Sequence, residues 1–106
     1  MPSQSSGARR NIRVRAPFVL HIAGRHFKVN DFSLRGVSIE APGVFMNVGE
    51  VFAGALTIPL KQGESRIPAW LTVVNLRPEK GIIGFTFGDP SEQLLKALME
   101  YIETAP

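Results

Sequence analysis

The chain has 106 residues, 44% apolar and 20% charged, a composition typical of one compact globular domain. It contains no cysteine, which excludes a disulfide framework, a thiolate zinc site and a cysteine nucleophile. The net charge of +3 is uneven, since residues 1–36 carry seven Arg or Lys and one acid, whereas residues 37–106 carry five and eight. We therefore expect the first third to face an anionic partner.

Residues 1–8 are small and polar without periodicity, so we expect a flexible N-terminal tail followed by one domain over residues 9–106. The N-terminus has no apolar signal core, and no apolar stretch reaches the roughly 18 residues that a membrane span needs. We expect a cytoplasmic domain that makes no membrane contact itself, either alone or as part of a larger, membrane-bound protein.

Short β-rich runs follow one another along most of the chain, separated by turns with Gly or Pro. Their regular spacing predicts six antiparallel strands in a small sandwich or barrel. The expected strands are residues 14–22, 26–29, 36–41, 50–60, 66–77 and 82–87, and the clearest turns are residues 23–25, 61–65 and 78–81.

The pattern changes at Asp89 to the period of an amphipathic helix. Asp89 is the expected N-cap, Pro90 the first helical residue and Glu92 the acid of a capping box. The predicted fold is therefore all-β with one C-terminal helix packed across a β-barrel. The apolar stripe of this helix comprises Leu94, Leu98, Tyr101 and Ile102, with Leu95 beside it.

Two polar patterns flank the first predicted hairpin. Arg9 and Arg13 have the spacing RxxxR, and Asp31, Ser33 and Gly36 have the spacing DxSxxG. Each pattern alone is a weak signal, because a basic run is often a solvated or protective edge and Asp with Ser is often a turn. Their occurrence in this order around one hairpin is much rarer.

On these residues the chain resembles the PilZ domain, the bacterial receptor module for cyclic di-GMP. The resemblance covers RRNIRV, DFSLRGVSIE, GIIGFTF and the C-terminal helix, and it implies a six-stranded PilZ-like antiparallel barrel. It also implies a non-enzymatic receptor with no cofactor besides the ligand, whose partner is an effector protein or a fused effector domain acting, for example, in polysaccharide synthesis, biofilm formation or motility. The implied ligand-binding residues are Arg9, Arg13, Asp31, Ser33 and Gly36, to which we add Arg10.

The chemistry of these side chains suits such a ligand. Arginine can bind phosphate oxygens or guanine O6 and N7 through its planar fork and can stack on a purine. Asp31 can accept from guanine N1–H and N2–H together, Ser33 offers a hydroxyl, and Gly36 permits a positive φ or a close backbone approach. We expect the arginine segment to close on the ligand as a latch.

Two departures from the family pattern leave questions open. Arg35 stands where many relatives have the first of two adjacent glycines. The sequence does not indicate in which direction the charged side chain of Arg35 points. Ala8 precedes the first motif arginine, where relatives often have a basic or polar residue, and this leaves open whether one ligand or a stacked pair binds.

Other interpretations of the chain remain. A PilZ domain that has lost its ligand would act as a protein-interaction module. A small basic barrel can instead bind single-stranded nucleic acid, with Phe18, Phe27 and Phe32 as stacking candidates, although these phenylalanines alternate as core residues would. Catalysis has no motif to support it, His21 and His26 are expected to be structural, and Trp70 is expected to pack in the core.

Overall fold

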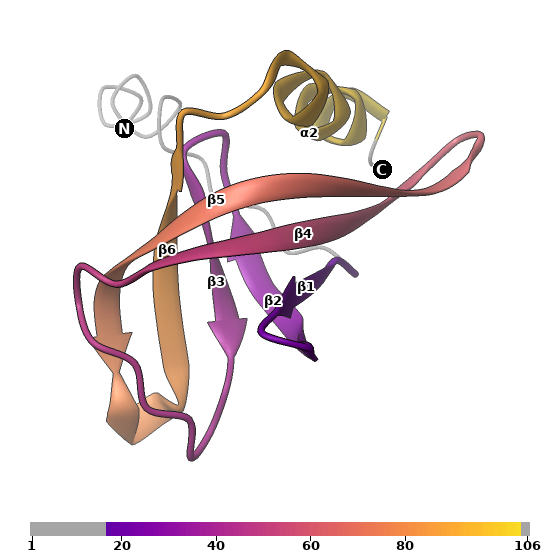
Figure 1. The fold of residues 1–106 in the computed structure, drawn as a ribbon. Coiled ribbons are helices and arrows are strands. Elements are labelled where there is room, and N and C mark those ends of the chain that lie inside the picture. The colour runs from indigo at the N-terminus through magenta and orange to yellow at the C-terminus, as the bar shows by residue number, and fades with distance from the viewer. Residues whose placement is uncertain (1–16, 105–106) are drawn as a thin grey trace, which may run out of the picture.

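The computed structural model describes residues 17–104, so the expected tail at residues 1–8 and the arginines Arg9, Arg10 and Arg13 lie outside the described part of the chain. Figure 1 shows the order of the elements. They are β1 (Val19–Ile22), β2 (Arg25–Phe32), β3 (Gly36–Glu40), β4 (Val51–Leu60), β5 (Gly63–Arg77), the 3₁₀ turn η1 (Pro78–Lys80), β6 (Ile82–Gly88) and the helix α2 (Glu92–Thr104).

The six strands form one closed antiparallel barrel in the order β1–β2–β3–β6–β5–β4. The short strand β1 closes it, because Leu20 lies opposite Phe27 of β2 on one side and opposite Leu56 of β4 on the other. A closed barrel leaves no unpaired sheet edge that could pair with another chain. The prediction of a six-stranded antiparallel barrel with one C-terminal helix is confirmed.

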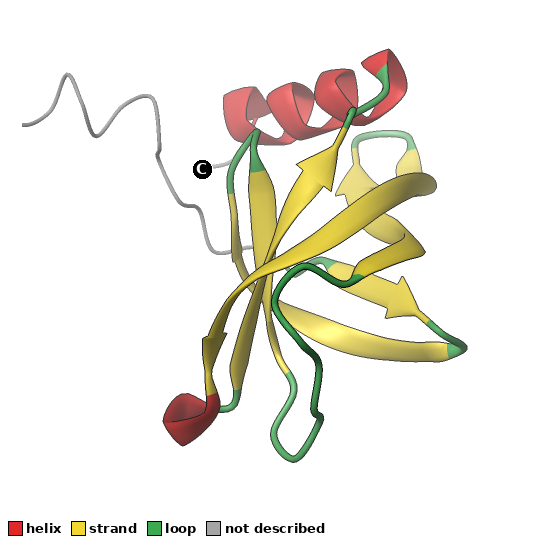
Figure 2. Cartoon of the chain, turned by 60° about the vertical axis from the view of Figure 1, so that its left-hand side comes forward, coloured by secondary structure: helices red, strands yellow, loops and turns green. Residues whose placement is uncertain are grey.

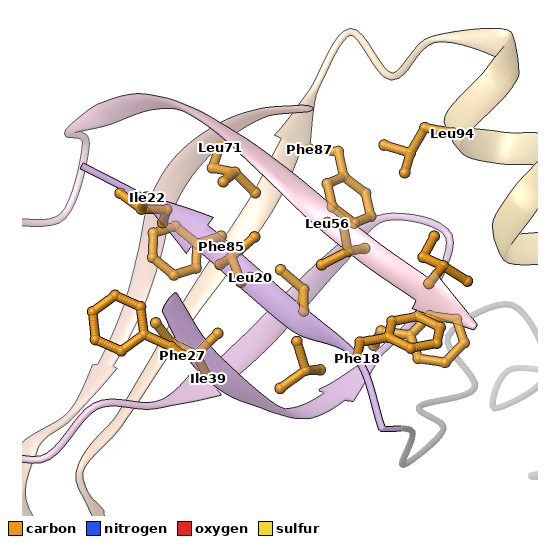
Figure 3. Close-up of a cluster of buried hydrophobic side chains, with 14 of the residues drawn as sticks. Phe18, Leu20, Ile22, Phe27, Ile39, Leu56, Leu71, Phe85, Phe87 and Leu94 are labelled. Atoms are coloured by element: carbon orange, nitrogen blue, oxygen red, sulfur yellow. The ribbon is translucent and has the colours of Figure 1, made fainter. Parts of the chain in front are cut away.

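The barrel interior is filled by alternate residues of every strand, and Figure 3 shows this cluster of side chains. In β6 the alternation is complete, with Ile83, Phe85 and Phe87 buried and the residues between them half-buried. Phe18, Phe27 and Phe32, the stacking candidates of the nucleic-acid interpretation, are 1%, 8% and 0% exposed. They belong to the core and present no ring to a base.

Trp70 is not a core residue, and that prediction is wrong. Its side chain is 57% exposed, whereas Leu71 and Val73 of the same strand are fully buried. Neighbouring residues of a strand point to opposite faces, so the burial of Leu71 directs Trp70 outward. Both faces of this part of β5 carry apolar residues, and the sequence therefore did not reveal which face lies inside.

Several strand boundaries also differ from the prediction. The first turn is formed by Ala23 and Gly24 alone, with φ of 52° and 75°, as expected for a two-residue hairpin of type I′. Strand β2 continues beyond Val29 to Phe32, and β5 already begins at Gly63. The first strand begins at Val19, and the residues predicted before Pro17 fall outside the described range.

The helix α2 lies across one end of the barrel (Figures 1 and 2). Its buried residues Leu94, Ala97 and Leu98 face the core, and the ring of Tyr101 lies edge-on to Phe18 with the centroids 4.9 Å apart. The helix therefore covers core side chains that would otherwise meet water at this end. No helix within residues 17–104 is long and apolar enough to cross a membrane.

The predicted cap of this helix is wrong. The backbone N–H of Leu94 donates to Ser91 Oγ at 3.0 Å, which makes Ser91 the N-cap and leaves Pro90 outside a helix that begins at Glu92. Asp89 has a left-handed φ of 49°, a conformation that belongs to the preceding turn. A serine hydroxyl bonded to the third helical amide satisfies a donor that the helix itself leaves unpaired.

Replacing Ser91 by Ala should therefore lower the free energy of unfolding by about 1 kcal/mol, because the Leu94 amide loses its partner. The matched control is Asp89→Asn, which removes the acid first expected to cap the helix and still tolerates a left-handed φ. Urea unfolding of both variants measures the difference. A larger loss in Asp89→Asn than in Ser91→Ala would contradict the assignment.

Candidate functional site

The three residues of the DxSxxG pattern lie together at the connection between β2 and β3. Asp31 is the second-last residue of β2, Ser33 follows that strand directly, and Gly36 is the first residue of β3. The structure thus brings these predicted site residues into one segment. The other predicted site residues, Arg9, Arg10 and Arg13, fall among the residues that the structure does not describe.

A β-bulge presents Asp31. Val29 lies opposite Ile39 and Asp31 lies opposite Ser38, so Asn30 is an extra residue in β2 relative to β3. Such an insertion bends the strand and changes the direction of its side chains. Asp31 consequently sits in a strand but carries a polar group to the outer surface of the barrel.

Within residues 17–104, Ser38 and Asn30 orient the Asp31 carboxylate. Ser38 Oγ donates to Asp31 Oδ1 at 2.8 Å, and Asn30 Nδ2 approaches Asp31 Oδ2 at 3.5 Å and Ser38 Oγ at 3.4 Å. Ser38 is 8% exposed, so this hydroxyl is largely shielded from water. Sequence reasoning missed Asn30 and Ser38. The polar serine between the apolar residues of GVSIE is the signal from which Ser38 could have been identified.

Ser33 shapes the turn. Its Oγ accepts from the Arg35 N–H at 3.2 Å, and its own N–H donates to the Gly36 carbonyl at 2.9 Å. The side chain is 5% exposed. These bonds give Ser33 a structural task in holding the turn, and its contact with a ligand stays a prediction.

Gly36 is required by a close approach of two backbones. It lies opposite Thr86 of β6, and a Cβ built on it would lie 2.1 Å from the Phe85 carbonyl oxygen. The adjacent carbonyl of Arg35 accepts from the Phe87 N–H at 2.8 Å and from Thr86 Oγ1 at 3.1 Å. The turn is therefore anchored on β6, while the Arg35 side chain is exposed to solvent.

A groove with a volume of about 740 Å³ runs across the outer face of β2, β3, β6 and β5. A second register shift on its far side makes Val74 an extra residue of β5, between the pairs Val73–Phe85 and Asn75–Gly84. The groove joins two carboxylates, Asp31 and Glu40, with amides and two cations, which suits a ligand with both anionic and hydrogen-bonding groups. Polar residues that line it include Asn30, Asp31, Ser38, Asn75, Arg77 and Lys80.

Sequence reasoning also missed Arg77 and Lys80. Arg77 is the last residue of the long strand β5, and Lys80 is the last residue of the turn η1. Both lie far from the two motifs along the chain. Strand order places β2 and β5 on the two sides of β3 and β6, so Asp31 and Arg77 lie on opposite walls of the groove. The pairing of β5 with β6 brings Arg77 and Lys80 to the groove, and no local sequence pattern indicates that pairing.

Comparisons with known proteins agree on the fold. The family model of the PilZ domain matches residues 4–104. The inhibitor of motility MotI/DgrA of Bacillus subtilis is similar in structure, with a TM-score of 0.72 and 17% identity over 84% of this chain and 46% of that chain. This chain thus spans about half of that protein. The PilZ domain of CeSA from a cellulose-synthesizing bacterium has a TM-score of 0.57 and 15% identity over 86% and 94% of the two chains. No curated protein matches by sequence.

Replacing Gly36 by Ala should lower the free energy of unfolding by about 2 kcal/mol or more, because the new methyl group meets the Phe85 carbonyl and the backbones must separate. The control is Gly84→Ala in the same sheet, whose Cβ would lie 3.3 Å from Asn75 Cβ and should cost clearly less. Denaturant unfolding measures both variants. Equal losses would show that the close approach at Gly36 is unimportant.

Proposed function

Because the chain belongs to the PilZ domain family, a family of cyclic di-GMP receptors, we propose that it binds cyclic di-GMP in the groove beside Asp31. Modules of this family are generally receptors rather than enzymes. The observation that supports the proposal most directly is the Asp31 carboxylate, held by Ser38 at the wall of the groove. The volume of about 740 Å³ falls within the usual range of small-molecule sites.

Asp31 provides the guanine specificity. Guanine presents N1–H and N2–H on one edge, and a carboxylate can accept from both, whereas adenine offers no such pair of donors. An ionised carboxylate has about four acceptor positions, so Asp31 can accept from Ser38 and from guanine at the same time. The hydrogen bond from Ser38 fixes the orientation of the Asp31 carboxylate in the unliganded protein. Less side-chain entropy is then lost when the ligand binds.

The cations of the groove and of the N-terminal segment neutralise the two phosphodiester groups. Arg77 and Lys80 lie on the wall opposite Asp31. Arg9, Arg10 and Arg13 complete the site from the other motif, where guanidinium groups bind phosphate and stack on guanine. Ser33 and Gly36 hold the turn that carries Asp31 near β6.

The start of the described chain supports a contribution from these arginines. The Val29 N–H donates to the Phe18 carbonyl at 3.1 Å, and the Phe18 and Phe32 rings lie 4.5 Å apart, so the chain enters the barrel beside the part of β2 that contains Asp31. Arg13 is four residues before Pro17, a tether of at most about 14 Å. This short tether supports a position of Arg13 near the groove.

Closure of the arginine segment on the ligand transmits the signal. A ligand shifts a conformational equilibrium only as far as it binds one state better, and the arginine contacts exist only in the closed state. The closed segment then presents a new surface to an effector protein or a fused effector domain. Motility and cellulose synthesis, named for the two structural neighbours, are the outputs of this kind that we propose to test first.

Changing Arg9 or Arg13 to Ala should abolish binding of cyclic di-GMP, because each removes a charged fork from the phosphodiester or guanine. Titration calorimetry measures the affinity and the stoichiometry, with GMP and cyclic di-AMP as control ligands. Thermal unfolding of the unliganded variants should stay close to that of the wild type, since both residues precede the barrel. Normal binding by either variant would refute the latch.

Changing Asp31 to Asn should weaken cyclic di-GMP binding by roughly 10- to 100-fold, because the acceptor pair for guanine is lost while the shape is retained. The matched control is Glu40→Gln, which removes the same charge from another residue that lines the groove. Calorimetry on both variants compares them at equal net charge. A similar loss in Glu40→Gln would show a general electrostatic effect and not recognition of guanine by Asp31.

A further inference from the structure

A second hollow, of about 560 Å³, lies on another face of the barrel and shares no residue with the groove at Asp31. It is formed by the β1–β2 turn, the middle of β4 and one residue of β5. Its floor includes three small residues of β4, Ala53, Gly54 and Ala55. The charged or titratable residues of its rim are His21, Arg25, His26 and Arg66.

This rim is cationic and lacks a compensating acid. No carboxylate lines the hollow, and among residues 17–104 only Lys96 and Glu92 lie within ion-pair distance of each other. Lys28, exposed on β2 opposite Val19, extends the positive surface. The nearest acid along β5 is Glu64, two positions from Arg66 and outside the hollow.

The two histidines contribute to this surface from neighbouring strands. His21 and His26 lie opposite each other with ring centroids 6.1 Å apart, and His21 Nε2 lies 2.8 Å from Thr57 Oγ1. Burial, Arg66 and His26 together lower the pKa of His21 below 6.5. Arg66 and His26 thus disfavour the protonated form of His21, and no carboxylate lines the hollow to offset their effect.

From this arrangement we infer that the hollow and its cationic rim form a docking site for an extended acidic segment of a partner protein. His26 on β2 and Arg66 on β5 are separated by three strand spacings in the order β2–β1–β4–β5, or up to about 14 Å. Four or five extended residues cover this span. Successive carboxylates of an acidic segment would then contact His26 at one side of the hollow and Arg66 at the other.

The composition of the hollow favours an acidic peptide over a nucleic acid. Proteins that bind single strands combine a cationic groove with aromatic rings on which bases stack. The lining contains no aromatic ring except the two imidazoles, and Phe27 beneath Arg25 is buried, with Arg25 Cζ 5.1 Å from its centroid. The small residues of the floor instead leave room for a peptide backbone.

A fluorescent hexaglutamate peptide is the probe for this site, with hexaglutamine and oligo-dT as comparison ligands. The wild-type protein at low salt should bind hexaglutamate, and Arg66→Gln should weaken binding roughly fivefold or more, as expected for a charge-assisted contact. The matched control, Lys96→Gln, removes one positive charge from the exposed surface of α2 and should change the affinity less than twofold. Fluorescence anisotropy measures each affinity.

Proton NMR locates the peptide, because the chain has two histidines and both lie on the rim. Hexaglutamate should raise the pKa of His21, since carboxylates stabilise the imidazolium, and should shift the ring signals of His26. The variant His26→Gln assigns the signals to the two residues. Thr57 Oγ1 lies 2.8 Å from His21 Nε2, Arg25 and Arg66 line the same hollow as the two rings, and Lys28 lies two residues beyond His26 on β2. Binding should accordingly be tighter at pH 6 than at pH 8.

Three results would overturn the inference: no binding of hexaglutamate, equal weakening by Arg66→Gln and Lys96→Gln, or tighter binding of oligo-dT than of hexaglutamate. Arg66 is exposed, so its variant should fold, and His26→Gln tests the same rim from another strand. The inference is independent of cyclic di-GMP binding. Protein that binds the peptide but not the nucleotide would leave this site in place and refute only the proposed receptor function.

Discussion

The closure of the barrel by the four-residue strand β1 is the constraint on which the rest of the structure depends. Leu20 pairs with residues of both β2 and β4, and its buried side chain joins the core. If β1 were absent, β2 and β4 would each have an open edge and the core would be exposed along one side. The same strand connects the arginine segment to the barrel and carries His21 on its outer face.

The DxSxxG pattern has a structural task at each of its three positions. Ser33 bonds the turn, Gly36 lets β3 approach Phe85, and the bulge at Asn30 directs Asp31 outward. The DxSxxG spacing therefore has a reason in the backbone geometry. A substitution at Gly36 acts through folding, whereas a substitution at Asp31 changes the groove without entering the core, and the two positions must be interpreted differently.

The charge asymmetry of the sequence corresponds to surfaces that the fold assembles from distant segments. Arg25 and Lys28 come from the basic first third, yet Arg66 from the more acidic remainder completes the cationic rim. On the other face, Asp31 of the first third lies across the groove from Arg77. The two faces are thus chemically distinct, one purely cationic and one mixed, which allows them to receive different partners.

Local patterns alone determined the number of strands, the C-terminal helix and the residues of both motifs, because alternation of apolar side chains, turn residues and helical periodicity act over a few neighbours. Tertiary structure alone decided that Trp70 faces outward and that Ser38, Arg77 and Lys80 share a groove with Asp31. These features depend on which face of a strand meets the core and on the register between strands far apart in the chain. No window of neighbouring residues contains that information.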